Sequence, residues 1–159
     1  MDWSVVDLGK YKGKGKILPQ VVFDDPDWFF WAYGQGVFRG RFAAEAEYVY
    51  RRARRIRVPP DEDGERLEVE YTVTPKDGTF AVMECVPPSQ RLHARSTRRP
   101  WIDLRFPSAV CPYDKTGGRL LVRAAKSILF SSAAVRMTAA LAAAFFGDDN
   151  NFDLKGDVG

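Results

Sequence analysis

Four lysines occur at every second position in the stretch GKYKGKGK, at positions 10 to 16, and an aromatic-rich segment follows at 28–33. Lysines on a glycine-rich turn can bind phosphates without reading a base sequence, and an exposed aromatic ring can stack on a base. The candidate nucleic-acid-binding residues of this turn are Lys10, Tyr11, Lys12, Lys14 and Lys16.

A second group of cations ends a predicted helix over about 38–56. Arg51, Arg52 and Arg55 lie on its polar side, where they would extend the lysine patch. Residues 1–59 and 85–126 carry net charges of +4 and +7, whereas the segment between them is acidic. A basic surface attracts polyanions. Solvated arginine faces balanced by the acidic segment are the plainer interpretation, and whether the two basic blocks form one surface depends on the fold.

No common nucleotide-binding motif fits the glycine-lysine stretch. A P-loop needs a second glycine five positions after the first, and Lys14 stands there after Gly9. The dinucleotide-binding fingerprint fails because Leu18 occupies the place of its third glycine. The lysines therefore do not belong to either of these loops.

Metal and catalytic sites lack support in the sequence. His93 is the only histidine and the two cysteines are far apart, so these residues assemble no zinc site. Acidic residues at 61–70 are the ligand type of a metal-dependent nuclease, but a solvated turn and strand face explains them better. We expect no cofactor and no metal. An enzyme whose site combines His93, Asp103 and Tyr113 is the least favoured alternative.

The elements that position the lysines and aromatics are predicted from caps and periodicity. Residues 17–22 are expected to be extended. A helix over about 25–34 is indicated by an aspartate cap, a proline in its first turn and a glycine at its end. Trp28 and Trp31 share one face of this helix, and we expect both to be buried. The next helix, about 38–56, has one apolar stripe at helical period.

The middle of the chain changes to a period of two residues, which is typical of strands. Alternating apolar residues and the turn PKDG predict an antiparallel hairpin over about 66–86. A short strand is predicted at about 101–106, and the segment 89–98 before it is expected to be a loop. Two further helices are predicted over about 117–130 and 131–146, with a strand as the alternative for the first because of its β-branched residues.

These patterns predict an α+β fold in which a small antiparallel sheet packs against N-terminal and C-terminal helices. We expect a single domain over 1–147, with parts 1–58 and 59–147, and a flexible tail at 148–159. No apolar run reaches about 18 residues, so we expect no membrane partner and a cytoplasmic protein.

The first third of the chain, about 5–56, resembles the C-terminal accessory module of exodeoxyribonuclease X-like proteins. In that module a Gly-Lys-Tyr-Lys-Gly-Lys turn precedes an Asp-Pro-x-Trp-x-x-Trp helix, and both parts occur here. The matching residues are Leu8, Gly9, Lys10, Tyr11, Lys12, Gly13, Lys14, Asp25, Pro26, Trp28 and Trp31. The resemblance implies a nucleic-acid-associated, non-catalytic module of a bacterial or phage protein. An extra Gly-Lys pair lengthens the turn, and the remainder of the chain has no counterpart in the module.

The sequence favours a non-catalytic protein that binds DNA or RNA weakly, without sequence preference, through the lysine turn. The alternative is a protein–protein interaction domain of a phage- or plasmid-type accessory protein. Such a domain would dock a partner through its aromatic helix or through an edge of its hairpin.

Overall fold

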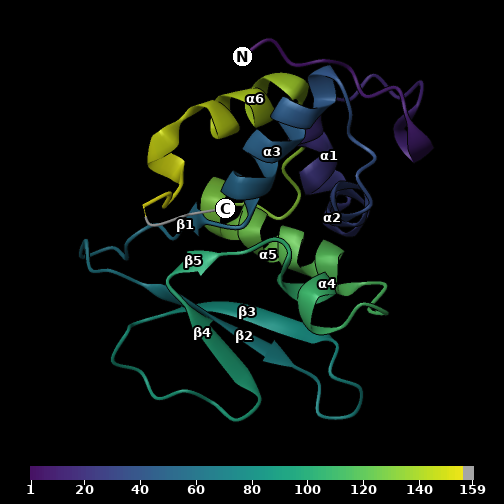
Figure 1. Cartoon of the computed structure of the whole chain (residues 1–159). Helices are drawn as coiled ribbons and strands as arrows, with labels where there is room; N and C mark the ends of the chain where they lie inside the picture. Colours follow the sequence, from purple (N-terminus) through teal and green to yellow (C-terminus); the bar gives the residue numbers. More distant parts are fainter. Residues whose placement is uncertain (156–159) are drawn as a thin grey trace.

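The chain folds into helices packed against small antiparallel sheets, which confirms the α+β class (Figure 1). The computed structural model describes residues 1–155. Its α-helices are α1 (Leu18–Asp24), α2 (Pro26–Gly34), α3 (Arg41–Ala53), α4 (Phe106–Val110), α5 (Gly117–Phe130) and α6 (Ala139–Gly147). Its strands are β1 (Ile56–Arg57), β2 (Glu68–Val73), β3 (Phe80–Val86), β4 (Ser96–Arg99) and β5 (Trp101–Ile102). None of the helices described is long and apolar enough to cross a membrane.

The helix predicted over about 25–34 is confirmed as α2. Asp25 caps it, because one carboxylate oxygen accepts a hydrogen bond from the Trp28 amide at 3.1 Å. The preceding segment was expected to be extended and instead forms α1. Pro19 lies in the first turn of α1, where its missing N–H breaks no helical hydrogen bond. Gln20 also accepts a hydrogen bond from the Ile17 amide at 3.1 Å and closes that end of the helix.

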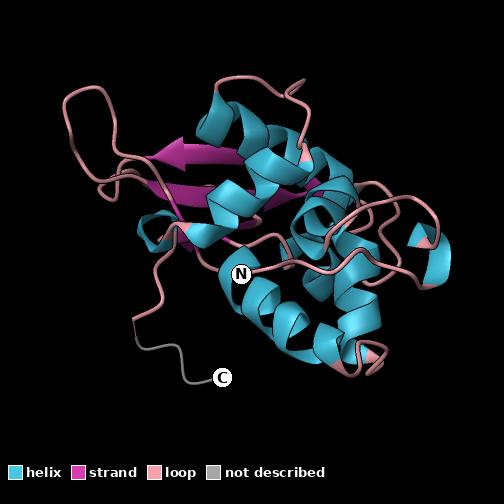
Figure 2. Ribbon diagram, turned by 90° about the horizontal axis from the view of Figure 1, so that it is seen from above, coloured by secondary structure: helices cyan, strands magenta, loops and turns pink. Residues whose placement is uncertain are grey.

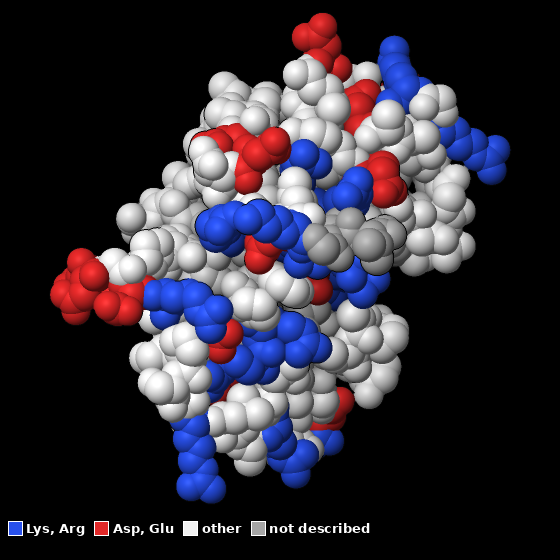
Figure 3. Space-filling model, turned by 60° about the vertical axis from the view of Figure 1, so that its left-hand side comes forward, with Lys and Arg blue, Asp and Glu red and all other residues white. Residues whose placement is uncertain are grey.

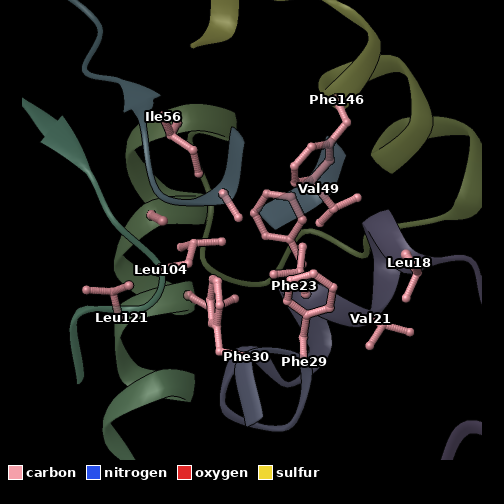
Figure 4. Packing of buried hydrophobic residues seen from close by; sticks show 14 of the residues in the cluster. Leu18, Val21, Phe23, Phe29, Phe30, Val49, Ile56, Leu104, Leu121 and Phe146 are labelled. Carbon is pink, nitrogen blue, oxygen red and sulfur yellow. The ribbon is translucent and has the colours of Figure 1, made fainter. Parts of the chain in front are cut away.

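The apolar stripe of the next helix is confirmed as the buried face of α3. Phe42, Ala46, Val49 and Ala53 are all buried. Phe23 of α1 packs near them, and its ring lies edge-on to Phe130, Phe145 and Phe146 at centroid distances of 6.2, 5.7 and 5.9 Å. Figure 4 shows Phe23 between Val49 and Phe146 on one side and Phe29 on the other. The core therefore joins helices from both ends of the chain.

The predicted hairpin is confirmed as β2 and β3, with Tyr71 opposite Met83. The third strand of this sheet is β4, in order β3-β2-β4, where a loop was expected. The strand expected at 101–106 is only the two-residue β5, which pairs with β1 in a separate sheet. Strand β4 lacks apolar alternation, but Arg98 lies opposite Glu70 and forms a salt bridge with it at 2.8 Å. A charged cross-strand pair therefore helps to hold β4 beside β2, and hydrophobic periodicity does not reveal this strand.

The C-terminal third differs from expectation in two places. Helix α5 is confirmed and packs on β3, so the helices lie over one face of the sheet (Figure 2). The final helix begins only at Ala139, where the Thr138 hydroxyl accepts a hydrogen bond from the Leu141 amide at 3.1 Å. The tail expected to be flexible from 148 is packed instead, because Phe152 is only 1% exposed. Residues 156–159 lie outside the described part.

Candidate functional site

A basic pocket of about 460 Å³ lies between the N-terminal turn, α1, α5 and the loop before α6. Six cations line it: Lys14, Lys16, Arg119, Arg123, Lys126 and Arg136. Asp24 is its one lining carboxylate. The pocket thus unites lysines selected from the sequence with cations more than 100 positions later in the chain. Its apolar lining residues, Phe23, Val122 and Met137, are all buried.

Helix α5 supplies half of these cations. Arg119, Arg123 and Lys126 are spaced at i, i+4 and i+7, which places them on one face of a helix. On the other side of α5, Leu121 and Ala125 are buried in the core. The amphipathic pattern of α5 therefore fixes the direction in which its cations point.

The lysine turn is held at its base by strand-like pairing. Val5 and Ile17 form an antiparallel bridge, and the Val6 amide donates to the Lys16 carbonyl at 2.7 Å. Gly13 and Gly15 have φ values of 76° and 69°, which glycine adopts readily. These two residues let the chain reverse and bring Lys14 and Lys16 to the pocket.

The six cations of the pocket face one lining carboxylate, that of Asp24. None of them forms a salt bridge within residues 1–155. The pKa of Lys126 is lowered, chiefly because its ammonium is partly buried, and also because Arg123 and Lys16 repel it. The negative charge of Asp24 acts in the opposite direction and raises the pKa of Lys126. Unpaired like charges around one cavity favour the binding of an anion.

Tyr11 cannot act as the base-stacking residue that the sequence suggested. It is 3% exposed, its hydroxyl donates to Asp24 at 2.6 Å, and its ring lies edge-on to Trp28 at 5.0 Å. Burial, and then the hydrogen bond to Asp24, raises the pKa of its phenol. Tyr11 anchors the lysine turn to α1 and α2. Lys10 turns away into a salt bridge with Asp25, and Lys12 is exposed outside the pocket lining.

Arg52 at the end of α3 and Arg55 just beyond it are engaged away from the lysine turn. The guanidinium of Arg52 lies 3.5 Å from the centroid of the Tyr48 ring and forms a salt bridge with Asp149. Arg55 covers Trp101 and donates to the Asp153 carbonyl at 2.6 Å. Arg51, the third candidate of this group, does not line the basic pocket. Arg52 and Arg55 therefore hold the C-terminal segment in place.

Basic side chains also gather on a second face. Figure 3 shows Lys and Arg across the side of the molecule that lies at the left of Figure 1, with acidic side chains among them. Part of the second basic block is neutralised by pairing. Arg98 binds Glu70, which is 2% exposed, and hydrogen bonds from Arg98 and His93 lower the pKa of that carboxyl. Cations of the two basic blocks, 1–59 and 85–126, therefore meet at the pocket, where α5 lies beside Lys14 and Lys16. Arg98 takes no part in this meeting.

The residues of the least favoured alternative, an enzyme, have separate partners. His93 contacts Glu70 at 2.5 Å, whereas the exposed Tyr113 donates to the Asp77 carbonyl at 3.3 Å. Asp103 accepts a hydrogen bond from the Arg105 amide at 2.8 Å. None of the three lines the basic pocket.

Four of the pocket cations were not selected from the sequence. The spacing of Arg119, Arg123 and Lys126 on a predicted amphipathic helix was the available signal for three of them. Arg136 follows the end of α5 and belongs to no sequence pattern.

The sequence also predicted that Trp31 is buried in the core beside Trp28. Trp31 is 58% exposed, so that prediction is wrong. The Trp28 ring is only partly buried and packs against Tyr11 and Phe38.

Beside Trp31, the partly buried Asp27 lies against the start of α5. Its pKa is raised to about 6, chiefly by burial and then by the charges of Asp25 and Asp114. One of its carboxylate oxygens is buried without a hydrogen-bond partner in the described structure. The charged form of Asp27 is therefore less stable in the folded chain than in the unfolded chain.

Replacing Asp27→Asn is expected to stabilise the protein at pH 7 by about 1 kcal/mol, a modest value because water screens this partly exposed group. The folded chain binds the proton more tightly, so wild-type stability falls as pH rises from the usual value of 3.8 to about 6. Urea unfolding of both proteins between pH 3 and 8 measures this. The gain should disappear below pH 4. The same gain in the exposed control Asp7→Asn would contradict the assignment.

Comparisons with protein-family models, curated proteins and solved structures find no match to this chain. The resemblance of residues 5–56 to the exodeoxyribonuclease X-like module therefore stays a prediction. A function has to be inferred from the basic pocket itself.

Proposed function

We propose that the protein binds nucleic acid, without catalysis and without sequence preference, through the basic pocket. The observation that carries this proposal is the meeting of Lys14 and Lys16 with the unpaired cations of α5 around one cavity. Six cations and one carboxylate line this cavity, so it carries a net positive charge. The resemblance of the N-terminal third to a nucleic-acid-associated module points in the same direction.

Phosphate contacts account for the expected lack of sequence preference. Lysine and arginine bind phosphate oxygens in any sequence, and the release of counterions supplies affinity. Recognition of bases by stacking needs an exposed aromatic face. Tyr11 in the lysine turn and Phe23 in the pocket lining are both buried. The pocket is therefore suited to the backbone of a strand and not to its bases.

Neutralising three pocket cations, Lys16→Gln, Arg123→Gln and Lys126→Gln together, is expected to weaken binding of a single strand roughly tenfold or more at low salt. The slope of log affinity against log salt should also fall by about 2, since each lost phosphate contact contributes about 0.7. Fluorescence anisotropy with single-stranded and duplex DNA and RNA, from 50 to 200 mM salt, measures both quantities.

The matched control removes three exposed cations outside the pocket, Lys12→Gln, Lys76→Gln and Arg91→Gln. It changes net charge equally but should keep most of the affinity and the slope. Absence of binding by the wild-type protein at 50 mM salt would refute the proposal. An unchanged salt slope in the pocket variant would also refute it.

A protein partner is the second candidate, and the exposure of Trp31 favours it. Trp31 lines a pocket of about 500 Å³ together with Phe30, Arg105 and Ser108. Exposed tryptophans are common at the centres of protein interfaces. Failure of nucleic-acid binding in the titrations above would leave this surface as the stronger candidate.

A further inference from the structure

We infer that the basic pocket holds the terminal phosphate of a nucleic-acid strand, an inference that rests on the proposed function. An internal phosphate carries one negative charge, whereas a terminal phosphomonoester carries nearly two at pH 7 and presents three strong acceptor oxygens. The pocket concentrates six cations around about 460 Å³, with one carboxylate among them. This charge suits a terminal group better than a single phosphodiester.

The arrangement of the cations supports an end over the middle of a strand. Cations that follow a backbone form an extended row, because each phosphate lies further along the strand. Here the cations converge on one cavity from the turn, from α5 and from Arg136 in the loop before α6. Cations on several sides can all contact a terminal phosphate, whereas an internal phosphate has the strand continuing on both sides of it.

The other residues that line the pocket offer little to bind a sugar or a base, so the phosphate is the part of the ligand that the pocket recognises. Gln20 is already engaged, because its amide nitrogen donates to the Met137 carbonyl at 3.2 Å and its oxygen accepts from the Ile17 amide at 3.1 Å. Asp24 accepts from Tyr11. The apolar lining side chains of Phe23, Val122 and Met137 offer no hydrogen bond to a sugar. Arg123 is exposed and free to present its guanidinium fork to phosphate oxygens.

The test compares 12-nucleotide single strands of one sequence that carry a 5′-phosphate, a 3′-phosphate or only hydroxyl ends. We expect one phosphorylated strand to bind roughly tenfold tighter than the hydroxyl strand at 100 mM salt, as charge-assisted hydrogen bonds form. Arg123→Gln should abolish this preference, whereas Lys12→Gln, outside the pocket, should keep it. The preference should shrink at pH 5, since a phosphomonoester gains its second proton near pH 6.

Equal binding of all three strands by the wild-type protein would overturn the terminal-phosphate inference and leave the proposed function standing. No binding of any strand would overturn both. If inorganic tripolyphosphate displaces the phosphorylated strand at equal concentration, the ligand is a free polyphosphate, and the strand-end inference is also overturned. Thermal unfolding of each variant shows whether it is folded. Arg123 is exposed, so its replacement should leave the fold intact.

Discussion

Replacing Phe152→Ala is expected to lower the free energy of unfolding by about 3–5 kcal/mol, the usual cost of removing a buried phenylalanine. Its ring is 1% exposed and lies 5.3 Å from Phe145 and 5.5 Å from Phe146, measured between centroids. The substitution opens a cavity in the aromatic core and releases the segment that Arg52 and Arg55 hold. Urea unfolding followed by circular dichroism measures the loss.

The control for this prediction is Asn150→Ala, two positions earlier on the same segment. Asn150 is exposed, and it is its carbonyl that accepts from Arg57, so the substitution keeps that bond. Its stability should stay within about 0.5 kcal/mol of the wild type. A loss below about 1 kcal/mol for Phe152→Ala would mean that the segment is not docked in solution.

The second large effect is expected at the start of α5. An added Cβ at Gly117 would lie 2.2 Å from a carboxylate oxygen of Asp114 and 3.0 Å from the Cβ of Phe80. Asp114 is buried and accepts hydrogen bonds from the amides of Phe80, Thr116 and Gly117 at 2.9, 3.1 and 2.7 Å. Gly117→Ala must displace this carboxylate and leave buried amides unpaired, so we expect a loss of about 2–4 kcal/mol.

Gly34→Ala at the end of α2 is the matched control. Nothing lies within 4 Å of a Cβ added there, and the residue is helical. Alanine at such a position is neutral or stabilises by about 0.4–1 kcal/mol, because it restricts the unfolded chain. Both substitutions add one methyl group to a helical glycine, one at the start of α5 and the other at the end of α2. Equal stability of both proteins in thermal and urea unfolding would refute the crowding at Gly117.

The fold was predictable where hydrophobic periodicity is strong. The apolar stripe of α3 reports burial directly, and it was found. In β2 the alternation is broken, because Val69 and Tyr71 are buried as expected but Glu70 between them is buried as well, where His93 and Arg98 bind its carboxylate. Strand β4 was missed because its placement depends on Arg98 reaching Glu70, a contact between residues far apart in the sequence. Phe152 was missed because a single apolar residue in a polar tail has no period. Its burial depends on a cavity that other helices build.

The candidate site was predictable only in part. Lys14 and Lys16 follow from the composition of the turn, but their partners on α5 meet them through the tertiary fold. The burial of Tyr11 also depends on tertiary packing, because the Trp28 ring has to lie close to the turn. Gly9 permits this approach, because a Cβ there would lie 2.7 Å from the Trp28 ring. The glycine-lysine pattern therefore encodes a contact between the turn and α2 as well as a charged surface.

The short strand β1 has a consequence for how the chain can fold during synthesis. Ile56 pairs with Ile102 and also bridges to Phe152, while Arg55 binds Asp153, 98 positions further along. The first half of the chain therefore leaves the ribosome before any of these partners exists. The pairing of β1 with β5 can form once residue 102 has been made, but the contacts with Phe152 and Asp153 form only after residue 153. Closing such distant contacts is slow because a long loop must first be ordered. Until those last contacts form, one side of β1 stays unpaired, and unpaired strand edges promote aggregation.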